Sequence, residues 1–330
     1  MNPLRKCFTC WVLTVILTFC GCAYHKKITP VEVSDVYTVQ GNSGSPATRF
    51  APMFLVYDYQ NDCNRIGQPS AKYEDNGSEH IFVDIEKPVF YYMERQFKTD
   101  KGLYTNYIYR VHFPQVPFSL FPFYLTSGNN VGLMIIVTVD SENRPALITS
   151  VHTCGCYLAI VPTSHLPCDS LPENWKEGPK KVYGEILPGK LDYTQKQNPK
   201  VLVYLRPDVH RVMNLEIIED PVLDNGNGFK ITDAPLVPMV DLETIPINGK
   251  TTSFYHNKGL MKGHVRGSVK YWESIFMSLV SLDLFVGTDK AYADTEVTDN
   301  PFYTSLKPWN RDSSNIWNFA RFLEFWGWKL

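Results

Sequence analysis

The sequence has little net charge and no long block of charges of one sign. It holds 32 Lys and Arg against 34 Asp and Glu, which gives a formal charge of −2, and the two signs are interspersed along the chain. Proteins that bind nucleic acid usually concentrate positive charge on one face or in one tail. A nucleic-acid partner is therefore not expected.

Long apolar runs are also lacking. A membrane-spanning helix needs about 20 apolar residues, whereas the N-terminal run from Cys7 to Cys20 is shorter and is soon followed by His25-Lys26-Lys27. Arg5 and Lys6 precede this run, and a positive segment followed by a short apolar one is typical of an export signal. We therefore expect residues 1–21 to be a signal peptide that is cleaved.

The end of this signal, Leu17-Thr18-Phe19-Cys20-Gly21-Cys22, resembles the lipobox of bacterial lipoproteins. In that family a small residue precedes a cysteine that is acylated, and Gly21-Cys22 supplies this pair. The resemblance implies a palmitate-bearing Cys22 that anchors the exported chain to a membrane, since each buried methylene contributes about 0.8 kcal/mol. Ala23 replaces the aspartate that retains lipoproteins at the inner membrane. In a Gram-negative host the resemblance therefore implies the periplasmic face of the outer membrane. The alternative is an ordinary signal peptide or an uncleaved anchor.

Common catalytic motifs are absent as well. The chain contains neither Gly-x-Ser-x-Gly nor His-Glu-x-x-His, which mark serine hydrolases and zinc proteases. Aromatic residues make up 14% of the chain, and such side chains fill cores or line surfaces that meet other molecules. The sequence thus favours a non-enzymatic binding or assembly module of the cell envelope, with an envelope protein, a glycan or a lipid as its partner.

Short runs rich in β-branched and aromatic residues predict a mostly β body. The predicted strands are residues 54–57, 80–85, 104–113, 131–140, 182–186, 200–205 and 212–218. The clearest hairpin joins residues 132–139 to 146–151, and both arms are apolar enough to be buried. Further turns are predicted at 225–228 and at Asn248-Gly249. We expect a mainly β or α+β fold, with an antiparallel, sandwich-like sheet body.

The two ends of the mature chain differ from this body. Residues 22–48 are polar and rich in Gly and Ser, which predicts a flexible tether between the lipid and one globular domain at 49–330. Within the helical C-terminal part, about 268–330, two aromatic-rich helices are predicted. The first, 268–286, is apolar on most faces and is expected in the core, and the second follows a predicted N-cap at Asp312-Ser313-Ser314. The second helix either closes the core or meets a membrane or partner.

One segment gathers many potential ligands. Residues 152–168 contain His152, Cys154, Cys156, His165 and Cys168. If the segment is extended, the first three point to one side of the sheet, and the last two could return from the following loop. This combination suits zinc or copper. The alternative function is therefore a metal-binding or thiol-redox envelope protein.

Disulfides compete with this interpretation. Beyond Cys22, the mature chain has an even set of four cysteines, Cys63, Cys154, Cys156 and Cys168. Exported domains usually pair such cysteines. Because cysteines two residues apart bond to each other only with strain, we expect Cys154 and Cys156 to pair with Cys63 and Cys168 in two structural bridges, with no cofactor. Buried free thiols are the remaining alternative.

Overall fold

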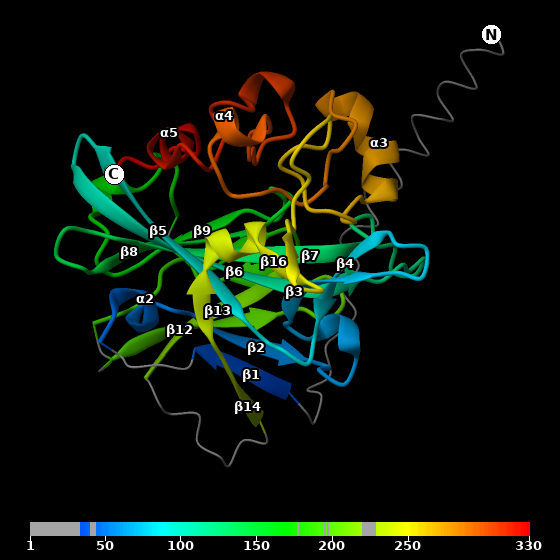
Figure 1. Cartoon of the computed structure of the whole chain (residues 1–330). Coiled ribbons are helices and arrows are strands. Elements are labelled where there is room, and N and C mark those ends of the chain that lie inside the picture. The colour runs from blue at the N-terminus through cyan, green and yellow to red at the C-terminus, as the bar shows by residue number, and fades with distance from the viewer. Residues whose placement is uncertain (1–33, 40–43, 177, 195, 197, 220–228) are drawn as a thin grey trace, which may run out of the picture.

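A β-sandwich forms the body of the protein. The computed structural model describes residues 34–39, 44–176, 178–194, 196, 198–219 and 229–330, so the expected signal peptide, Cys22 and the turn predicted at 225–228 lie outside the described residues. Most of the described chain forms strands in two large sheets and three hairpins, with short helices mainly towards the C-terminus (Figure 1). The predicted β-rich, sandwich-like fold with C-terminal helices is confirmed.

The smaller of the two large sheets, sheet A, has five strands. Their order is β13 (Val212–Glu219), β12 (Pro199–Leu205), β2 (Met53–Tyr57), β1 (Ser34–Val39) and β14 (Phe229–Ala234). Strand β1 runs antiparallel to β2 and parallel to β14, and β12 runs parallel to β2. Sheet A is therefore mixed: the N-terminal strands β1 and β2 lie between β12 on one side and β14 on the other, both from the second half of the chain.

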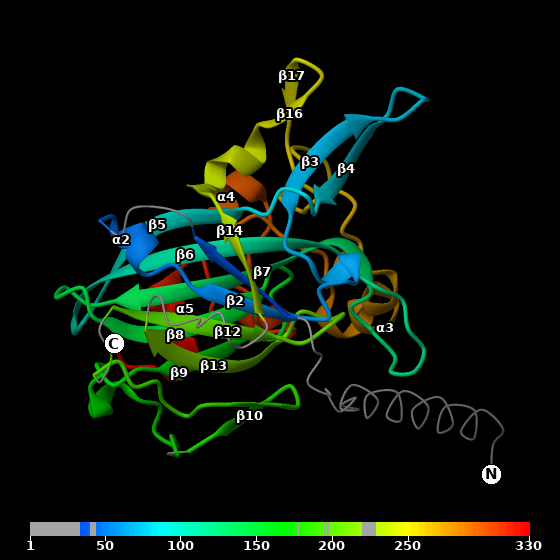
Figure 2. The ribbon, with the colours of Figure 1, turned by 90° about the horizontal axis from the view of Figure 1, so that it is seen from below.

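The larger sheet, sheet B, is an antiparallel meander with one parallel strand at its edge. Its order is β15 (Leu236–Pro238), β5 (Phe90–Thr99), β6 (Gly102–Val116), β7 (Gly128–Val139), β8 (Pro145–His152) and β9 (Ala159–Pro162). Hairpins β3 (Gln68–Tyr73) with β4 (Glu79–Asp84), β10 (Lys180–Val182) with β11 (Glu185–Leu187), and β16 (Ile245–Ile247) with β17 (Lys250–Thr252) surround it. Seen from below, the strands of sheet A lie across those of sheet B (Figure 2).

Sheet B is covered on both faces. Along β6, Tyr109 and Phe113 point into the core shared with Phe54 of sheet A, whereas Ile108 packs against the C-terminal third of the chain, in a cluster that includes Phe322. Alternate residues of a strand point to opposite faces, so a strand covered on both faces needs apolar residues at nearly every position. This explains the continuous apolar run at β7 and confirms that both arms of the β7–β8 hairpin are buried.

The covering layer above sheet B in Figure 1 contains most of the helices. Its α-helices are α3 (Tyr271–Ser281), α4 (Thr295–Thr298) and α5 (Phe319–Phe325), and α2 (Pro46–Arg49) lies near sheet A. The 3-10 helices are η2 (Asp62–Asn64), η3 (Cys168–Ser170), η4 (Met239–Glu243) and η5 (Pro308–Asn310). None of the helices in the described ranges has the length and apolarity to cross a membrane.

Three expectations require correction. Strand β1 lies within the predicted tether, so a tether cannot extend to residue 48, because residues 34–39 pair with two strands of sheet A. The stretch 182–186 is not one strand, since Tyr183 and Gly184, both with positive φ, form the turn between β10 and β11. Helix α5 begins after Asn318 instead of after residues 312–314, and Ser314 instead binds Thr304.

The predicted core helix is also wrong in its burial. Helix α3 is shorter than 268–286, and Ile275, Leu279 and Val280 are exposed, with 79% of Leu279 accessible. Its buried residues are Glu273, Met277 and Ser281. The helix thus turns its polar and sulfur-bearing side chains inward and its apolar ones outward, which is the reverse of an ordinary surface helix.

Candidate functional site

The residues after β8 form a tight turn that positions two cysteines. The His152 N–H donates to the Cys156 carbonyl at 3.0 Å, and the Gly155 N–H donates to the His152 carbonyl at 2.8 Å. Gly155 has a φ of 90°, and a Cβ there would lie 2.1 Å from the Tyr303 carbonyl oxygen. The expected extended segment is therefore wrong beyond His152, because the chain reverses in a turn that only glycine fits.

The two cysteines of this turn are adjacent thiols at the wall of a cavity. The Cys156 N–H donates to Cys154 Sγ at 3.4 Å, and the Cys156 thiol donates to Oε1 of Glu273 at 3.3 Å. Cys154 is buried, whereas Cys156 is partly accessible. The site therefore presents two sulfurs and a carboxyl group from α3 to the same space.

A buried ion pair lies behind the thiols. Lys270, directly before α3, has its Nζ 3.1 Å from Oδ2 of Asp289, and both side chains are almost fully buried. Oδ1 of Asp289 accepts from the Gly132 N–H at 3.3 Å and from the Thr153 hydroxyl. The pair therefore joins β7, the cysteine turn and the start of α3 at one point.

A second buried lysine supports the same turn. Lys290 Nζ donates to the carbonyl oxygens of Cys154, at 3.2 Å, and Thr288, at 3.3 Å. It also lies 4.7 Å from the centre of the Tyr303 ring, close enough for a cation–π contact. Lys290 thus fixes the backbone of Cys154, while the Cys154 side chain lines the cavity.

These surroundings shift the pKa values of the two thiols in opposite directions. Burial opposes ionisation of Cys154, but the hydrogen bond with Cys156 and the charge of Lys270 outweigh it and lower the pKa of Cys154. A hydrogen bond between the two thiol groups, together with burial, raises the pKa of Cys156 well above its ordinary value. The lower pKa favours the thiolate, which is the reactive form of cysteine, at Cys154, whereas Cys156 is the more accessible of the two sulfurs.

The neighbouring ionisable groups are shifted as well. Burial raises the pKa of Glu273, although Lys270 and the Cys156 thiol oppose the shift. Burial disfavours the charged form of Lys270, yet Asp289, the thiols and Glu273 outweigh it and hold the pKa of Lys270 well above its usual range. Buried groups with perturbed pKa values beside a cavity are typical of functional sites.

The cavity has a volume of about 530 Å³. It lies between the β6–β7 loop, the cysteine turn, α3, the β10–β11 turn and residues 303–306. The walls are largely aromatic and aliphatic, formed by Phe123, Tyr124, Leu125, Tyr157, Tyr183, Met277, Val286, Tyr303 and Leu306. Such a volume and lining are typical of small-molecule sites.

Two polar atoms at the cavity lack partners. Among the described residues, buried Nε of Arg211 and buried Oε2 of Glu273 have no hydrogen-bond partner, and both side chains line the cavity. Arg211 also lies over the Tyr157 ring, 5.3 Å from its centre. A buried polar atom without a partner costs free energy, so a ligand that binds these atoms would recover it.

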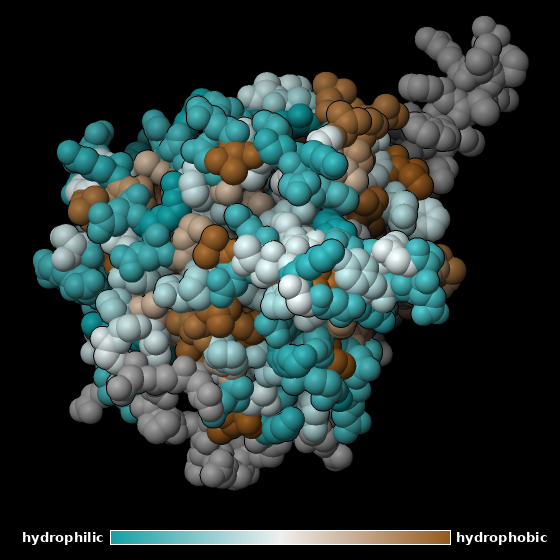
Figure 3. All heavy atoms as spheres, in the orientation of Figure 1, coloured by the Kyte–Doolittle hydropathy of each residue, from teal (hydrophilic) through white to brown (hydrophobic). Residues whose placement is uncertain are grey.

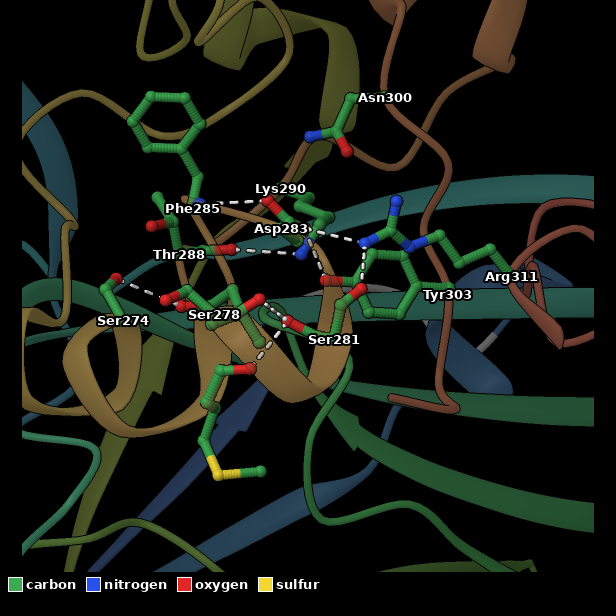
Figure 4. A network of polar contacts seen from close by, with 12 residues as sticks. Ser274, Ser278, Ser281, Asp283, Phe285, Thr288, Lys290, Asn300, Tyr303 and Arg311 are labelled. Carbon is green, nitrogen blue, oxygen red and sulfur yellow. Dashed lines mark hydrogen bonds and ion pairs between the residues drawn. The ribbon is translucent and has the colours of Figure 1, made fainter. Parts of the chain in front are cut away.

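A polar network fixes the end of α3 beside the cavity (Figure 4). The Tyr303 hydroxyl donates to Oδ2 of Asp283 at 2.5 Å, and Arg311 donates to the Ser281 carbonyl at 2.5 Å. The Ser281 hydroxyl in turn donates to the Met277 carbonyl at 2.9 Å. The helix wall of the cavity is therefore held by the C-terminal part of the chain.

The residues predicted as metal ligands do not form one centre. His152 is buried, with its Nε2 3.2 Å from the carbonyl oxygen of His210. His165 packs beside Tyr193, and Cys168 is exposed in η3. In the part of the chain that the structure describes, no group of three or more His, Cys, Asp or Glu side chains is arranged to hold a metal ion. Of the predicted ligands, only Cys154 and Cys156 lie together at the cavity. Their neighbours there, Lys270, Glu273 and Asp289, were not among the predicted ligands.

The disulfides predicted from the even cysteine count are not present in this structure. Cys63, Cys154, Cys156 and Cys168 are all free thiols. Cys63 is in η2, where its thiol lies 3.8 Å from Oδ1 of Asp208, and burial raises its pKa to about 12. Cys63 and Cys168 thus have surroundings separate from the cysteine turn.

Sequence reasoning missed Lys270, Glu273, Asp289, Lys290 and Arg211. Lys270 and Glu273 interrupt an apolar segment, and charged residues within such a segment are a signal of buried ionic partners. The partners themselves are distant in the sequence: Glu273 is 117 positions from Cys156.

Comparison with known proteins assigns the chain to no family. No family model, no curated protein and no solved structure matches this chain.

We expect Lys270→Met to lower the free energy of unfolding by about 3–5 kcal/mol, because it leaves the Asp289 carboxylate buried without its cation. The double variant Lys270→Met with Asp289→Asn should lower the free energy of unfolding by less, since the uncompensated charge is then removed. Urea unfolding measures both. Lys329→Met is the matched control, because Lys329 pairs with Glu173 over the same 3.1 Å but at the exposed surface; its loss should be about 0–1 kcal/mol. Equal losses for the two lysines would contradict the importance of burial.

Proposed function

We propose that this chain is an exported, lipid-anchored envelope protein that binds a small anionic amphiphile in the cavity beside α3. The observation that carries this proposal is the cavity itself: its walls are mostly apolar, and Nε of Arg211 and Oε2 of Glu273 have no hydrogen-bond partner within the described part of the chain. Apolar walls bind the body of an amphiphile, and a few placed polar groups bind its head.

The charge around Arg211 favours an anionic head group. Glu185 pairs with both Arg206 and Arg211, the second at 3.2 Å. One carboxylate therefore pairs with two guanidinium groups. Lys181 and Arg211 line the cavity together with one carboxyl group, Glu273, whose pKa is raised by burial. A carboxylate or phosphate on the ligand would balance the remaining positive charge, and hydrogen bonds between charged groups contribute about 1.5–3 kcal/mol.

This ligand class is tested with dansyl undecanoic acid, whose emission shifts to the blue in an apolar site. We expect saturable binding and, for Arg211→Met, an affinity lower by about tenfold to a hundredfold. For the uncharged amide of the probe, the affinities of the parent chain and of Arg211→Met should differ much less. Arg144→Met is the control, because Arg144 pairs with Asp140 in the exposed turn after β7. Absence of saturable binding, or equal affinity for Arg211→Met and the parent, would overturn the proposal.

An apolar surface adjoins the cavity and supports a position against a membrane. On α3 and directly after it, Ile275, Leu279 and Leu282 are exposed, and in the β6–β7 loop Phe121 is 96% accessible. Trp272 of α3 packs against Phe118 of the β6–β7 loop, with their ring centres 6.0 Å apart. Figure 3 shows this apolar surface at the upper right, where α3 lies in Figure 1. Large exposed apolar patches mark interaction sites.

A bilayer is the occupant that fits this surface best. Only residues 23–33 separate Cys22 from β1, and a chain of this length extends to at most about 40 Å. A lipid on Cys22 would therefore hold the body close to the bilayer, where the apolar side chains can enter the interface. Because α3 and the β6–β7 loop also line the cavity, an amphiphile would reach it directly from the membrane.

Vesicle sedimentation tests the membrane contact independently of the lipid. The mature chain with Cys22→Ser should bind vesicles of phosphatidylcholine and phosphatidylglycerol. Leu279→Glu and Phe121→Glu should each weaken binding by about tenfold or more, since burying one such side chain contributes about 1.5–3 kcal/mol. Ile186→Glu is the matched control, because Ile186 is also apolar and exposed, at 68%, but lies on β11. A parent chain that stays in the supernatant would assign this surface to a protein partner instead.

Metabolic labelling with palmitate tests the anchor. We expect label in the membrane fraction of the producing bacterium, with loss of the label and release of the chain for Cys22→Ser. Cys20→Ser should retain both, because bulky Phe19 precedes Cys20 where the lipobox has a small residue. Label that persists in Cys22→Ser would contradict the predicted anchor.

A further inference from the structure

We infer that Cys154 and Cys156 form a redox-active dithiol that exchanges with small disulfides entering the cavity. Cys154 Sγ accepts the Cys156 N–H at 3.4 Å within a turn that glycine alone permits, and both residues line the cavity wall. The inference depends on the cavity but not on the lipid anchor or the membrane contact.

The exchange begins at the sulfur of Cys154. Its thiolate attacks one sulfur of the bound disulfide, so a new bond forms between Cys154 and that sulfur while the original disulfide bond breaks. The other half of the ligand leaves as a thiolate and takes a proton. Lys270 lies behind the turn and favours the attacking thiolate through its charge. Cys154 thus becomes half of a mixed disulfide.

Cys156 completes the exchange. Its thiol proton passes to Oε1 of Glu273, with which it already forms a hydrogen bond of 3.3 Å. The resulting thiolate attacks Cys154 Sγ, and the second half of the ligand leaves as a thiol after protonation. Two electrons have then moved from the protein dithiol to the ligand disulfide, and the protein holds a Cys154–Cys156 disulfide. Oxidation of a small dithiol is the reverse reaction.

The geometry suits a labile disulfide better than a structural one. A bond between cysteines two residues apart carries strain, and strained disulfides are more easily reduced. Cys63 lies buried in η2 beside Asp208, and Cys168 lies exposed in η3, so neither is a natural resolving thiol for this turn.

Access restricts the substrate to small molecules. Cys154 is only 2% accessible and is reached through a cavity of about 530 Å³. A disulfide within a folded protein is too bulky to approach it, whereas an aromatic or aliphatic disulfide matches the apolar walls.

Glu273 is suited to receive the thiol proton. Its Oε1 already accepts a hydrogen bond from the Cys156 thiol at 3.3 Å, and burial raises the pKa of the carboxyl group, which favours its protonated form. A Cβ at residue 287 would lie 2.2 Å from Oε2 of Glu273, so Gly287 leaves the space that this carboxyl group occupies.

The decisive experiment uses the small aromatic disulfide dithiodipyridine and the mature chain carrying Cys22→Ser and Cys168→Ser, which removes the exposed thiol. We expect release of two thiopyridones per chain and a mass lower by two hydrogen atoms, with no adduct. Adding Cys156→Ser should stop the reaction at one thiopyridone and leave a stable adduct on Cys154. Two adducts on the parent chain, or a parent that reacts no faster than Cys154→Ser, would overturn the inference.

Glu273→Gln separates proton transfer from packing. The first thiopyridone should appear at least as fast as in the parent, because the charge of Glu273 raises the pKa of Cys154, whereas the second should appear about 100-fold more slowly, since a positioned base contributes at least that factor. In the parent, the rate of the second release should rise as Glu273 ionises, and Glu273→Gln should remove that rise. A parallel fall in both rates would assign Glu273 a structural role alone. Because the readouts are mass and thiopyridone, failure here leaves the amphiphile test unaffected.

Discussion

The buried ion pair between Lys270 and Asp289 is the contact on which the arrangement of the cavity depends. Asp289 also binds the backbone of Gly132 and the hydroxyl of Thr153, so one carboxylate joins the central strand of sheet B, the cysteine turn and the start of α3. A buried pair of this kind contributes little net stability compared with apolar residues, but loss of one partner is costly. Its role is therefore to fix where three elements meet.

This constraint explains why α3 is built in an unusual way. The helix begins beside a buried lysine and presents Glu273 and Met277 to the cavity, so its remaining faces hold the apolar residues. A helix that only covered a core would do the opposite. Glu273 on the inner side of α3 thus places a carboxyl group beside the Cys156 thiol.

Some strands were predictable because their signal is local, whereas others, such as the long β5, were missed. Alternation and β-branched content located β2, β4, β6, β7, β8, β12 and β13, and the continuous apolar character of β7 correctly indicated burial on both faces. The site was predictable only in part: Cys154 and Cys156 were identified, but as members of a metal or disulfide cluster. Their true neighbours come from residues more than 100 positions away, and no local pattern shows such contacts. The burial of α3 was wrong for a related reason, since hydropathy shows which residues are apolar and not which side of a helix the fold covers.

The two glycines at the site define a signature for recognising relatives. Gly155 is required by the Tyr303 carbonyl and Gly287 by the Glu273 carboxyl group, so neither position accepts a side chain while the thiols and the acid stay in place. A distant homologue that retains this chemistry should therefore combine Cys-Gly-Cys after a buried strand, Lys-x-x-Glu at the start of a helix, and Gly-Thr-Asp-Lys shortly beyond that helix. Such a sparse pattern can persist after the surrounding strands have diverged, because it is set by contacts between backbone and acid rather than by the overall composition of the core.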